Sequence, residues 1–392
     1  MTINEIEDGE KEMLAQETDG EDEIDDENSE IDEDEDEEEI QPFDPTKIRV
    51  KTKPLTMDLL IKRIKHNEIN LAPDFQRNAN IWSSKAQSRL IESLLIRIPL
   101  PAFYIDATDD TKWLIIDGLQ RISTFKSFIL DQELKLTGLE FLNNELNNKT
   151  YNQLSRDYQR RIDETELTLY LIEPGTPDEV KYKIFQRINT GGLPLNNQEL
   201  RQAMNSGPAT NFLKKLASLS EFERVTNLSE NRKKRLDDHE FVLGFIAFRL
   251  TKYQDYPTKK GRNYFLHEAM KKLNKIDKNL EKEIEHKFSI AMKAAYNIFG
   301  EDTFRKILNN SSKKSPVNKA LFECWSVALS QLTEQKIGIL INQKEKLKEL
   351  FIQNMESDPD FLQSISQAAN KVQYRFSKIN EMIEEVLSCS NP

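Results

Sequence analysis

The sequence predicts an α+β protein in which a small mixed α/β domain is followed by an all-helical domain. Two observations support this prediction. Between residues 102 and 172, short branched apolar runs alternate with stretches of helical periodicity. Beyond residue 206, strand signals nearly vanish and amphipathic helical patterns follow one another. We therefore expect an α/β domain at residues 46–205 and a helical domain at residues 206–392.

Residues 1–45 predict a disordered acidic tail before the first domain. They contain 23 Asp or Glu and one Lys, and residues 32–39 are all acidic. Self-repulsion and the lack of apolar side chains oppose a packed core there. The tail either serves only to keep the chain solvated, or competes with nucleic acid as a tethered polyanion.

The rest of the chain is basic. The whole chain has a net charge of −12, whereas residues 46–392 contain 44 acids and 54 bases. A basic surface can bind a polyanion such as DNA. Two basic runs are candidates for DNA contacts, although solvated surface charge is the default explanation for both. They are Arg232, Lys233, Lys234 and Arg235, and then Lys259, Lys260 and Arg262.

The sequence also indicates the cellular compartment of the protein. It contains no apolar run of 18 residues, and its acidic beginning lacks the apolar core of a secretory signal, so we expect no membrane contact. Cys324 and Cys389 are the only cysteines and lie far apart. Neither a disulfide framework nor a thiolate metal site is indicated, and we expect a cytoplasmic protein.

Periodicity predicts the order of elements. In the first half we expect helices over 57–66, 84–97, 120–130 and 196–203, a helix ending near 188, and strands over 102–106, 112–117 and 166–172. Residues 131–165 are expected to form a polar connector with a short helical piece near 151–161. In the second half we expect helices over 236–252, 263–273, 277–299, 317–332, 345–355 and 371–387.

Residues 114–125 form the first candidate site. Three branched apolar residues precede Asp117 and Gly118, and helical spacing follows, which predicts a strand, a tight turn and a helix. Arg121 can bind a phosphate in a bidentate manner and Asp117 can hold Mg²⁺ or a water. The alternative is an ordinary capped helix in which Arg121 pairs with Asp117. The candidate residues of this stretch are Asp117, Gly118, Gln120, Arg121, Ser123 and Thr124.

Two other stretches are candidates for the same site. Gln76 and Arg77 follow Pro73 on a segment that we expect to be irregular, although Arg77 could equally rest on Trp82 at the surface. The second stretch contains Asn189, Thr190, Gly191 and Gly192. Its paired glycines either end a helix or let the backbone approach a ligand closely.

Taken together, these three stretches resemble the family catalogued as domain of unknown function 262 over roughly residues 50–205. This domain is also the N-terminal part of the GmrSD-type modification-dependent restriction enzymes. The resemblance implies a fold like that of ParB and sulfiredoxin. It further implies binding of a nucleoside triphosphate with Mg²⁺, hydrolysed in several members and coupled to DNA cleavage or sensing.

The resemblance also implies roles for the candidate residues. By position, Asp117, Gly118, Gln120 and Arg121 are the signature, and Ser123 and Thr124 follow it. Gln76 and Arg77 would close the pocket from one side, and Asn189 with Gly191 and Gly192 from another. The chain departs from the family at Leu119, where a glutamine is usual. We also expect no nuclease of the HNH type, because the four histidines form no such cluster.

Three functions are open at this point. The first is a nucleotide-hydrolysing protein that acts on or senses DNA in prokaryotic antiphage defence, with Asp117 and Arg121 catalytic. The second is a non-catalytic nucleotide- or DNA-binding regulatory subunit. The third is a ParB-like DNA nickase. In the first two cases the helical half would bind DNA or a protein partner, and a homo-oligomer is compatible with each.

Overall fold

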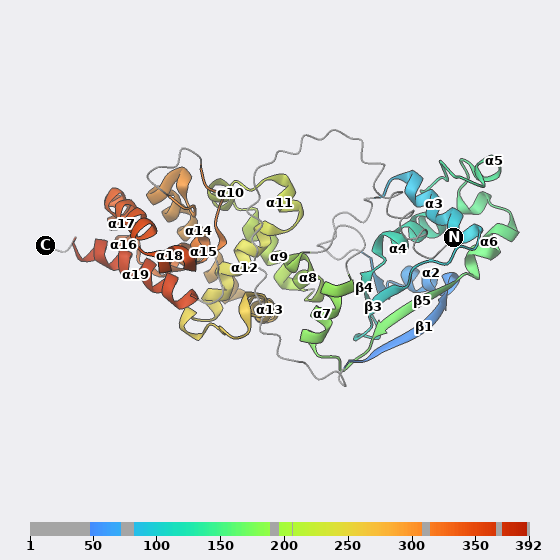
Figure 1. Cartoon of the computed structure of the whole chain (residues 1–392), viewed down its shortest axis with the longest axis horizontal. Coiled ribbons are helices and arrows are strands. Elements are labelled where there is room, and N and C mark those ends of the chain that lie inside the picture. Colours follow the sequence, from blue (N-terminus) through green and yellow to red (C-terminus); the bar gives the residue numbers. More distant parts are fainter. Residues whose placement is uncertain are drawn as a thin grey trace. The chain divides into compact units, whose positions relative to one another are not determined.

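The computed structural model describes residues 48–71, 82–188, 196–205, 207–307, 314–365 and 371–389. All of these belong to one compact unit, Glu38–Pro392 (Figure 1). The acidic tail lies outside the described residues, as do the candidates Gln76, Arg77, Asn189, Thr190, Gly191 and Gly192. The predicted boundary between residues 205 and 206 stays a prediction.

A five-stranded mixed sheet organises the first half, in the order β1-β5-β3-β4-β2. The β1–β5 and β3–β4 pairs are antiparallel, whereas β3–β5 and β2–β4 are parallel. The described strands are β1 (Val50–Thr56), β2 (Ile69–Asn70), β3 (Phe103–Asp106), β4 (Trp113–Asp117) and β5 (Glu166–Ile172). The helices of this half are α2 (Met57–Lys65), α3 (Ser84–Leu95), α4 (Leu119–Phe125), η2 (Lys126–Asp131), α5 (Asn143–Leu146), η3 (Tyr151–Gln153), α6 (Arg156–Asp163), α7 (Asp178–Ile188) and α8 (Asn197–Met204).

Alternating side chains along the strands give the sheet two covered faces. On one face, Leu169 and Ile105 join buried residues of α2, α3 and α4 in one apolar cluster. On the other face, Ile116 and Ile172 pack against α7 and α8. The sheet is therefore covered by helices on both faces, as in an α/β sandwich.

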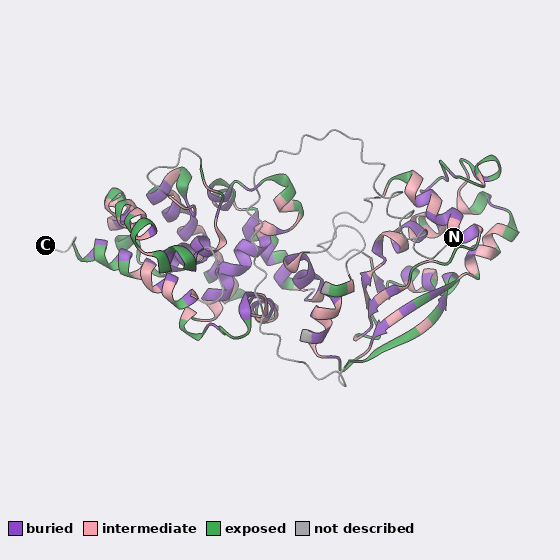
Figure 2. Cartoon of the chain, in the orientation of Figure 1, coloured by how far each residue is buried: buried purple, intermediate pink, exposed green. Residues whose placement is uncertain are grey.

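The second half is helical (Figure 1). Its described helices are α9 (Pro208–Ala217), α10 (Ser220–Thr226), α11 (Glu230–Lys234), α12 (Asp237–Leu250), η4 (Tyr253–Asp255), α13 (Gly261–Leu273), α14 (Lys278–Phe299), η5 (Gly300–Asp302), α15 (Lys319–Gln331), α16 (Glu334–Asn342), α17 (Lys344–Ser357), α18 (Pro359–Ser364) and α19 (Val372–Ser388). Buried positions dominate α12 and α15 (Figure 2). Phe241, Phe245 and Phe248 all lie in this core.

The predicted fold class is confirmed, because a mixed α/β part precedes a helical half. Each predicted strand and helix is present, most of them with shifted ends, and the structure adds β1, β2, α5, α9, α10, α11, α16 and α18. β1 follows no clear apolar alternation because Lys51 and Lys53 occupy the positions that face the core cluster. Within the described parts of the chain, no helix is long and apolar enough to cross a membrane.

Candidate functional site

The turn from β4 into α4 has the predicted form of strand, turn and helix. β4 ends at Asp117, Gly118 adopts a left-handed conformation with φ of 97°, and α4 begins at Leu119. A Cβ atom at Gly118 would collide with the ring of Phe103 on β3. Glycine is therefore required here both by the backbone angle and by the neighbouring aromatic ring.

The guanidinium of Arg121 donates hydrogen bonds to other residues of the protein. Its Nη2 lies 2.9 Å from Oδ2 of Asp117, and the same guanidinium donates to the carbonyl oxygens of Pro101 and Ala102. The guanidinium carbon lies 4.3 Å from the centre of the Phe103 ring, which adds a cation–π contact. Arg121 thereby fastens the segment before β3 to α4, in agreement with the simpler of the two sequence interpretations.

Burial sets the electrostatics of this pair. It lowers the pKa of the Arg121 guanidinium, and the charge and hydrogen bond of Asp117 oppose that shift. An arginine remains charged in spite of such a shift. The Arg121 side chain is 11% exposed, whereas Asp117 is 29% exposed. Asp117 is therefore the member of the pair that solvent or a ligand reaches more easily.

The other candidates of the stretch differ in accessibility. Thr124 is fully buried, and its hydroxyl donates to the carbonyl of Gln120 at 2.8 Å. That hydroxyl points into the helix and not toward a phosphate. Ser123 and Gln120 are half-buried on the first turns of α4. Of the predicted phosphate ligands in this stretch, Gln120 and Ser123 are the more accessible side chains, and Asp117, the predicted catalytic residue and magnesium ligand, is also partly exposed.

A magnesium ion would find few ligands among the described residues. In the described ranges, no group of three His, Cys, Asp or Glu side chains could hold a metal. Mg²⁺ commonly uses one or two carboxylates together with water and substrate phosphates. Asp117 can supply one carboxylate of such a set, with one of its oxygens already bound to Arg121.

The first basic run is partly neutralised. Arg232 pairs with Asp237, Lys233 with Glu223 and Glu230, and Arg235 with Glu199, whereas Lys234 is exposed. In the second run, Lys259 and Lys260 are exposed. Arg262 was predicted to lie in a loop and to contact DNA. It is instead a buried residue of α13, paired with Glu240 and Glu323, so a DNA phosphate cannot reach it there.

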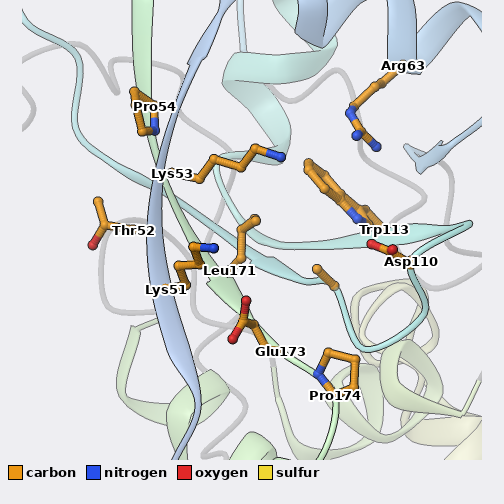
Figure 3. A pocket seen from close by; sticks show the side chains of 11 residues that line it. Lys51, Thr52, Lys53, Pro54, Arg63, Asp110, Trp113, Leu171, Glu173 and Pro174 are labelled. Atoms are coloured by element: carbon orange, nitrogen blue, oxygen red, sulfur yellow. The ribbon is translucent and has the colours of Figure 1, made fainter.

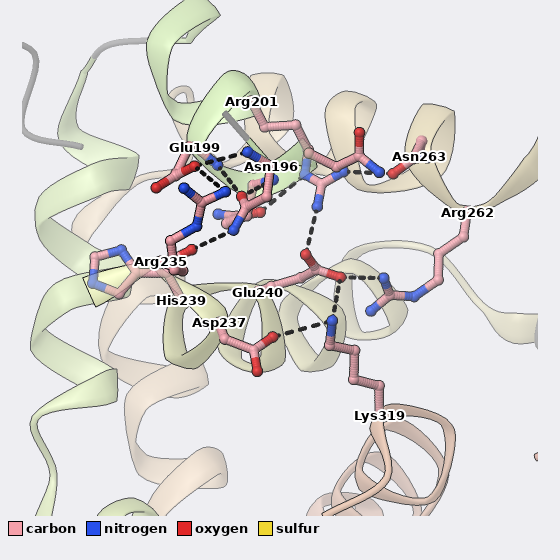
Figure 4. A network of polar contacts seen from close by, with 12 residues as sticks. Asn196, Glu199, Arg201, Arg235, Asp237, His239, Glu240, Arg262, Asn263 and Lys319 are labelled. Atoms are coloured by element: carbon pink, nitrogen blue, oxygen red, sulfur yellow. Dashed lines mark hydrogen bonds and ion pairs between the residues drawn. The ribbon is translucent and has the colours of Figure 1, made fainter. Parts of the chain in front are cut away.

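A buried ionic network joins α8 to the helical half (Figure 4). Arg201 of α8 is fully buried, and its Nη2 lies 3.0 Å from Oε2 of Glu240 on α12. Glu240 also pairs with Arg262 of α13 and with Lys319 of α15. The network continues through Glu323, which pairs with Arg262 and, at 3.0 Å, with Arg375 of α19.

This network was not predicted. Its members are ordinary charged residues in helical patterns, and only their burial distinguishes them. Gly244 lies next to this network within a helical pattern, where glycine is unusual. A Cβ atom there would lie 2.7 Å from Oε1 of Glu323, so glycine leaves room for that carboxylate. A second missed group lines a pocket beside β1 and includes Lys51, Lys53, Arg63 and Trp113.

Comparison with known proteins found a match for part of the first half of the chain. Residues 58–205 match the family model described as GmrSD restriction endonuclease, N-terminal domain. This stretch of the chain is therefore similar to a GmrSD-type N-terminal domain. No curated protein and no solved structure matches the chain.

The match begins in α2 and ends after α8. The GmrSD-type region thus includes the β4–α4 turn with Asp117 and Arg121, and also Arg201 of the ionic network. β1 and all helices from α9 onward lie outside it.

Proposed function

We propose that this protein acts in DNA restriction and that its GmrSD-type region binds a nucleoside triphosphate that controls the activity. The observation that carries the proposal is the match of residues 58–205 to the GmrSD N-terminal domain. The name of that family concerns restriction endonucleases, whose substrate is DNA. The nucleotide is an inference from the β4–α4 turn and its polar side chains.

Three features of the turn support a phosphate ligand. Asp117 is partly exposed and can hold a Mg²⁺ ion that bridges to a phosphate, Ser123 and Gln120 are half-buried hydrogen-bond donors on the same helix start, and the guanidinium of Arg121 lies 2.9 Å from Asp117. Phosphoryl transfer requires mainly positioning and charge neutralisation, which such groups can supply. For Arg121 to bind a phosphate directly, it must give up hydrogen bonds to Asp117 or to the carbonyls of Pro101 and Ala102.

That requirement favours a second candidate function, in which the domain binds a nucleotide or DNA without hydrolysing it. Arg121 already has protein partners for its guanidinium, and Leu119 is an apolar, largely buried residue between the polar ones. In this alternative, Arg121 is structural and the protein is a regulatory or adaptor subunit.

Thermal unfolding with each nucleoside triphosphate and Mg²⁺, combined with a phosphate-release assay, tests both candidates. A ligand at 100 times its Kd stabilises the folded state by about 2.7 kcal/mol, which raises the midpoint visibly. A raised midpoint with released phosphate supports the hydrolysing enzyme and identifies the base. A raised midpoint without phosphate supports the regulatory binder, and no shift with any nucleotide contradicts both forms of nucleotide binding.

The informative variant is Asp117→Asn, because the amide keeps the shape of the side chain and removes its charge. We expect it to lose phosphate release, and to lose the nucleotide-induced shift at least in part. Arg156→Ala is the control, since Arg156 is 73% exposed and far along the chain from the turn. Incubation of plasmid DNA with the same proteins and nucleotides tests restriction directly.

A further inference from the structure

A pocket of about 460 Å³ lies beside β1, at the end of the sheet opposite Asp117. It is formed by β1, the end of β5, the start of β4 and α2 (Figure 3). Trp113 begins β4 and Asp117 ends it, so the pocket and the β4–α4 turn lie at opposite ends of this strand, four positions apart. At the usual rise of a strand, this is roughly 13 Å.

Two lysines face the pocket from β1. Lys51 pairs with Leu171 and Lys53 with Leu169 across β1 and β5, so these lysines point to the same side of the sheet as the apolar core. Leu55, the next residue on that side, is buried in the core. Among the described residues, neither lysine has a carboxylate within 4.0 Å.

The wall of the pocket contains a buried donor. Trp113 is 2% exposed, and its indole nitrogen has no hydrogen-bond acceptor among the described residues. Lys53 and Arg63 both lie over the indole ring, at 5.7 Å and 4.1 Å from its centre (Figure 3). The nitrogen itself is buried, so Trp113 forms a wall of the pocket and its emission can report on a ligand that binds there.

The balance of charge indicates which acceptor fits. Lys51, Lys53 and Arg63 are cations, and Asp110 and Glu173 are the carboxylates in the same lining. Arg63 is also paired with Glu68 at 3.1 Å, so Lys51 and Lys53 are the cations of this lining that have no carboxylate within 4.0 Å among the described residues. Lysine binds phosphate as a point charge, and a phosphate group would give these two lysines an anionic partner.

We propose that this pocket is a phosphate-binding site, separate from the β4–α4 turn, for a nucleotide or for a nucleic-acid backbone. Lys51 and Lys53 provide the charge that attracts the phosphate. Arg63 is paired with Glu68, lies over the ring of Trp113 and forms a wall of the pocket together with it. The proposal does not depend on nucleotide binding at Asp117, because the two sites share no residue.

Titrations of the full chain, followed by tryptophan emission, test this site. Three ligands are compared: inorganic phosphate, adenosine triphosphate without Mg²⁺, and a short DNA oligonucleotide. We expect at least one of them to change the emission, and Trp113→Phe to remove the change, since the remaining Trp82 and Trp325 do not line the pocket. A response to the nucleotide identifies that source, and a response to DNA alone identifies the backbone.

The decisive variant is Lys51→Ala/Lys53→Ala, and Lys62→Ala/Lys65→Ala is its control with the same loss of charge. Lys62 and Lys65 are exposed on α2 and do not line the pocket. We expect binding to weaken about tenfold in the first variant, and for DNA the dependence of log Kd on log salt to fall by about two. Equal weakening in both double variants, or no binding of any of the three ligands, would overturn the proposal.

Discussion

The guanidinium of Arg121 lies 2.9 Å from the carboxylate of Asp117, so the two residues predicted to act on a phosphate are bound to each other. The same guanidinium donates to two carbonyl oxygens of the segment before β3. In this arrangement Arg121 links α4 to the segment before β3, and Asp117 is the more exposed member of the pair. A ligand that draws Arg121 away from Asp117 would therefore also loosen the connection between α4 and β3.

We expect Arg121→Ala to destabilise the protein by about 1.5–3 kcal/mol, because it removes charge-assisted hydrogen bonds and leaves their acceptors behind. Asp117→Asn should cost less than about 1 kcal/mol, since the pair is partly exposed and the amide can still accept from Arg121. Urea unfolding without ligand measures both. Equal costs for the two variants would show that Arg121 has no structural role beyond its pairing with Asp117.

Gly118→Ala should destabilise the protein by about 1–3 kcal/mol. The left-handed φ of 97° is unfavourable for alanine, and the new Cβ would collide with Phe103. Gly338 within α16 provides the matched control, because a Cβ there meets nothing within 4 Å. Gly338→Ala should instead stabilise by about 0.5–1 kcal/mol, the usual gain in a helix interior. The two changes thus differ in sign, and urea unfolding compares them.

The native protein should have one reactive thiol. Burial raises the pKa of the Cys324 thiol to about 12, so it stays protonated at pH 8 as well as inaccessible. Cys389 is exposed near the end of α19. Titration with a thiol reagent at pH 8 should give one equivalent in the native state, two in denaturant, and none in native Cys389→Ser. Rapid reaction of that variant would mean that the α15 core opens readily.

Periodicity was sufficient for the elements that pack one apolar face. The long helices α14 and α19 show such a face, whereas the strands over 103–106 and 113–117 and helix α12 were found as apolar runs that are buried on more than one side. Periodicity failed for β1, where lysines stand on the core side, and for the short helices of the second half. For residues 131–165 the sequence predicted a polar connector with a short helical piece near residues 151–161, where the structure has η3 and α6, but it did not predict α5. Glu92 of α3 orders part of that stretch, because its buried carboxylate accepts from three successive backbone N–H groups.

The site was predictable where the side chains are close in sequence, and unpredictable where they meet across the fold. Asp117 and Arg121 are four residues apart, and their pairing was one of two stated alternatives. The pocket beside β1 combines Lys53 with Trp113, and the ionic network combines Arg201 with Glu240. No local pattern connects such residues, since tertiary packing alone brings them together. The proposed approach of Arg77 and Asn189 to Arg121 lies outside the described residues and stays a prediction.

The ionic network predicts a specific dependence of stability on pH. Burial alone would raise the pKa of Glu240, but Lys319, Arg262 and Arg201 outweigh it and hold that pKa well below its ordinary value. The unfolded chain therefore binds the proton at higher pH than the folded one. The stabilisation is complete above the unfolded pKa of about 4.3, and is lost as the pH falls through the lower folded pKa.

Glu240→Gln should therefore destabilise the protein at pH 7 by about 3–5 kcal/mol, because it leaves buried cations without their carboxylate. It should also make the free energy of unfolding less dependent on pH below about 4.3 than in the unmodified protein. Glu230→Gln is the control, since Glu230 is 78% exposed and should alter neither quantity by more than about 0.5 kcal/mol. Urea unfolding at pH 7, 5 and 4 provides the comparison. If Glu240→Gln kept the same slope with pH, the carboxylate of Glu240 would not be the anion that balances the buried arginines, and the junction between α8 and α12 would depend on apolar packing instead.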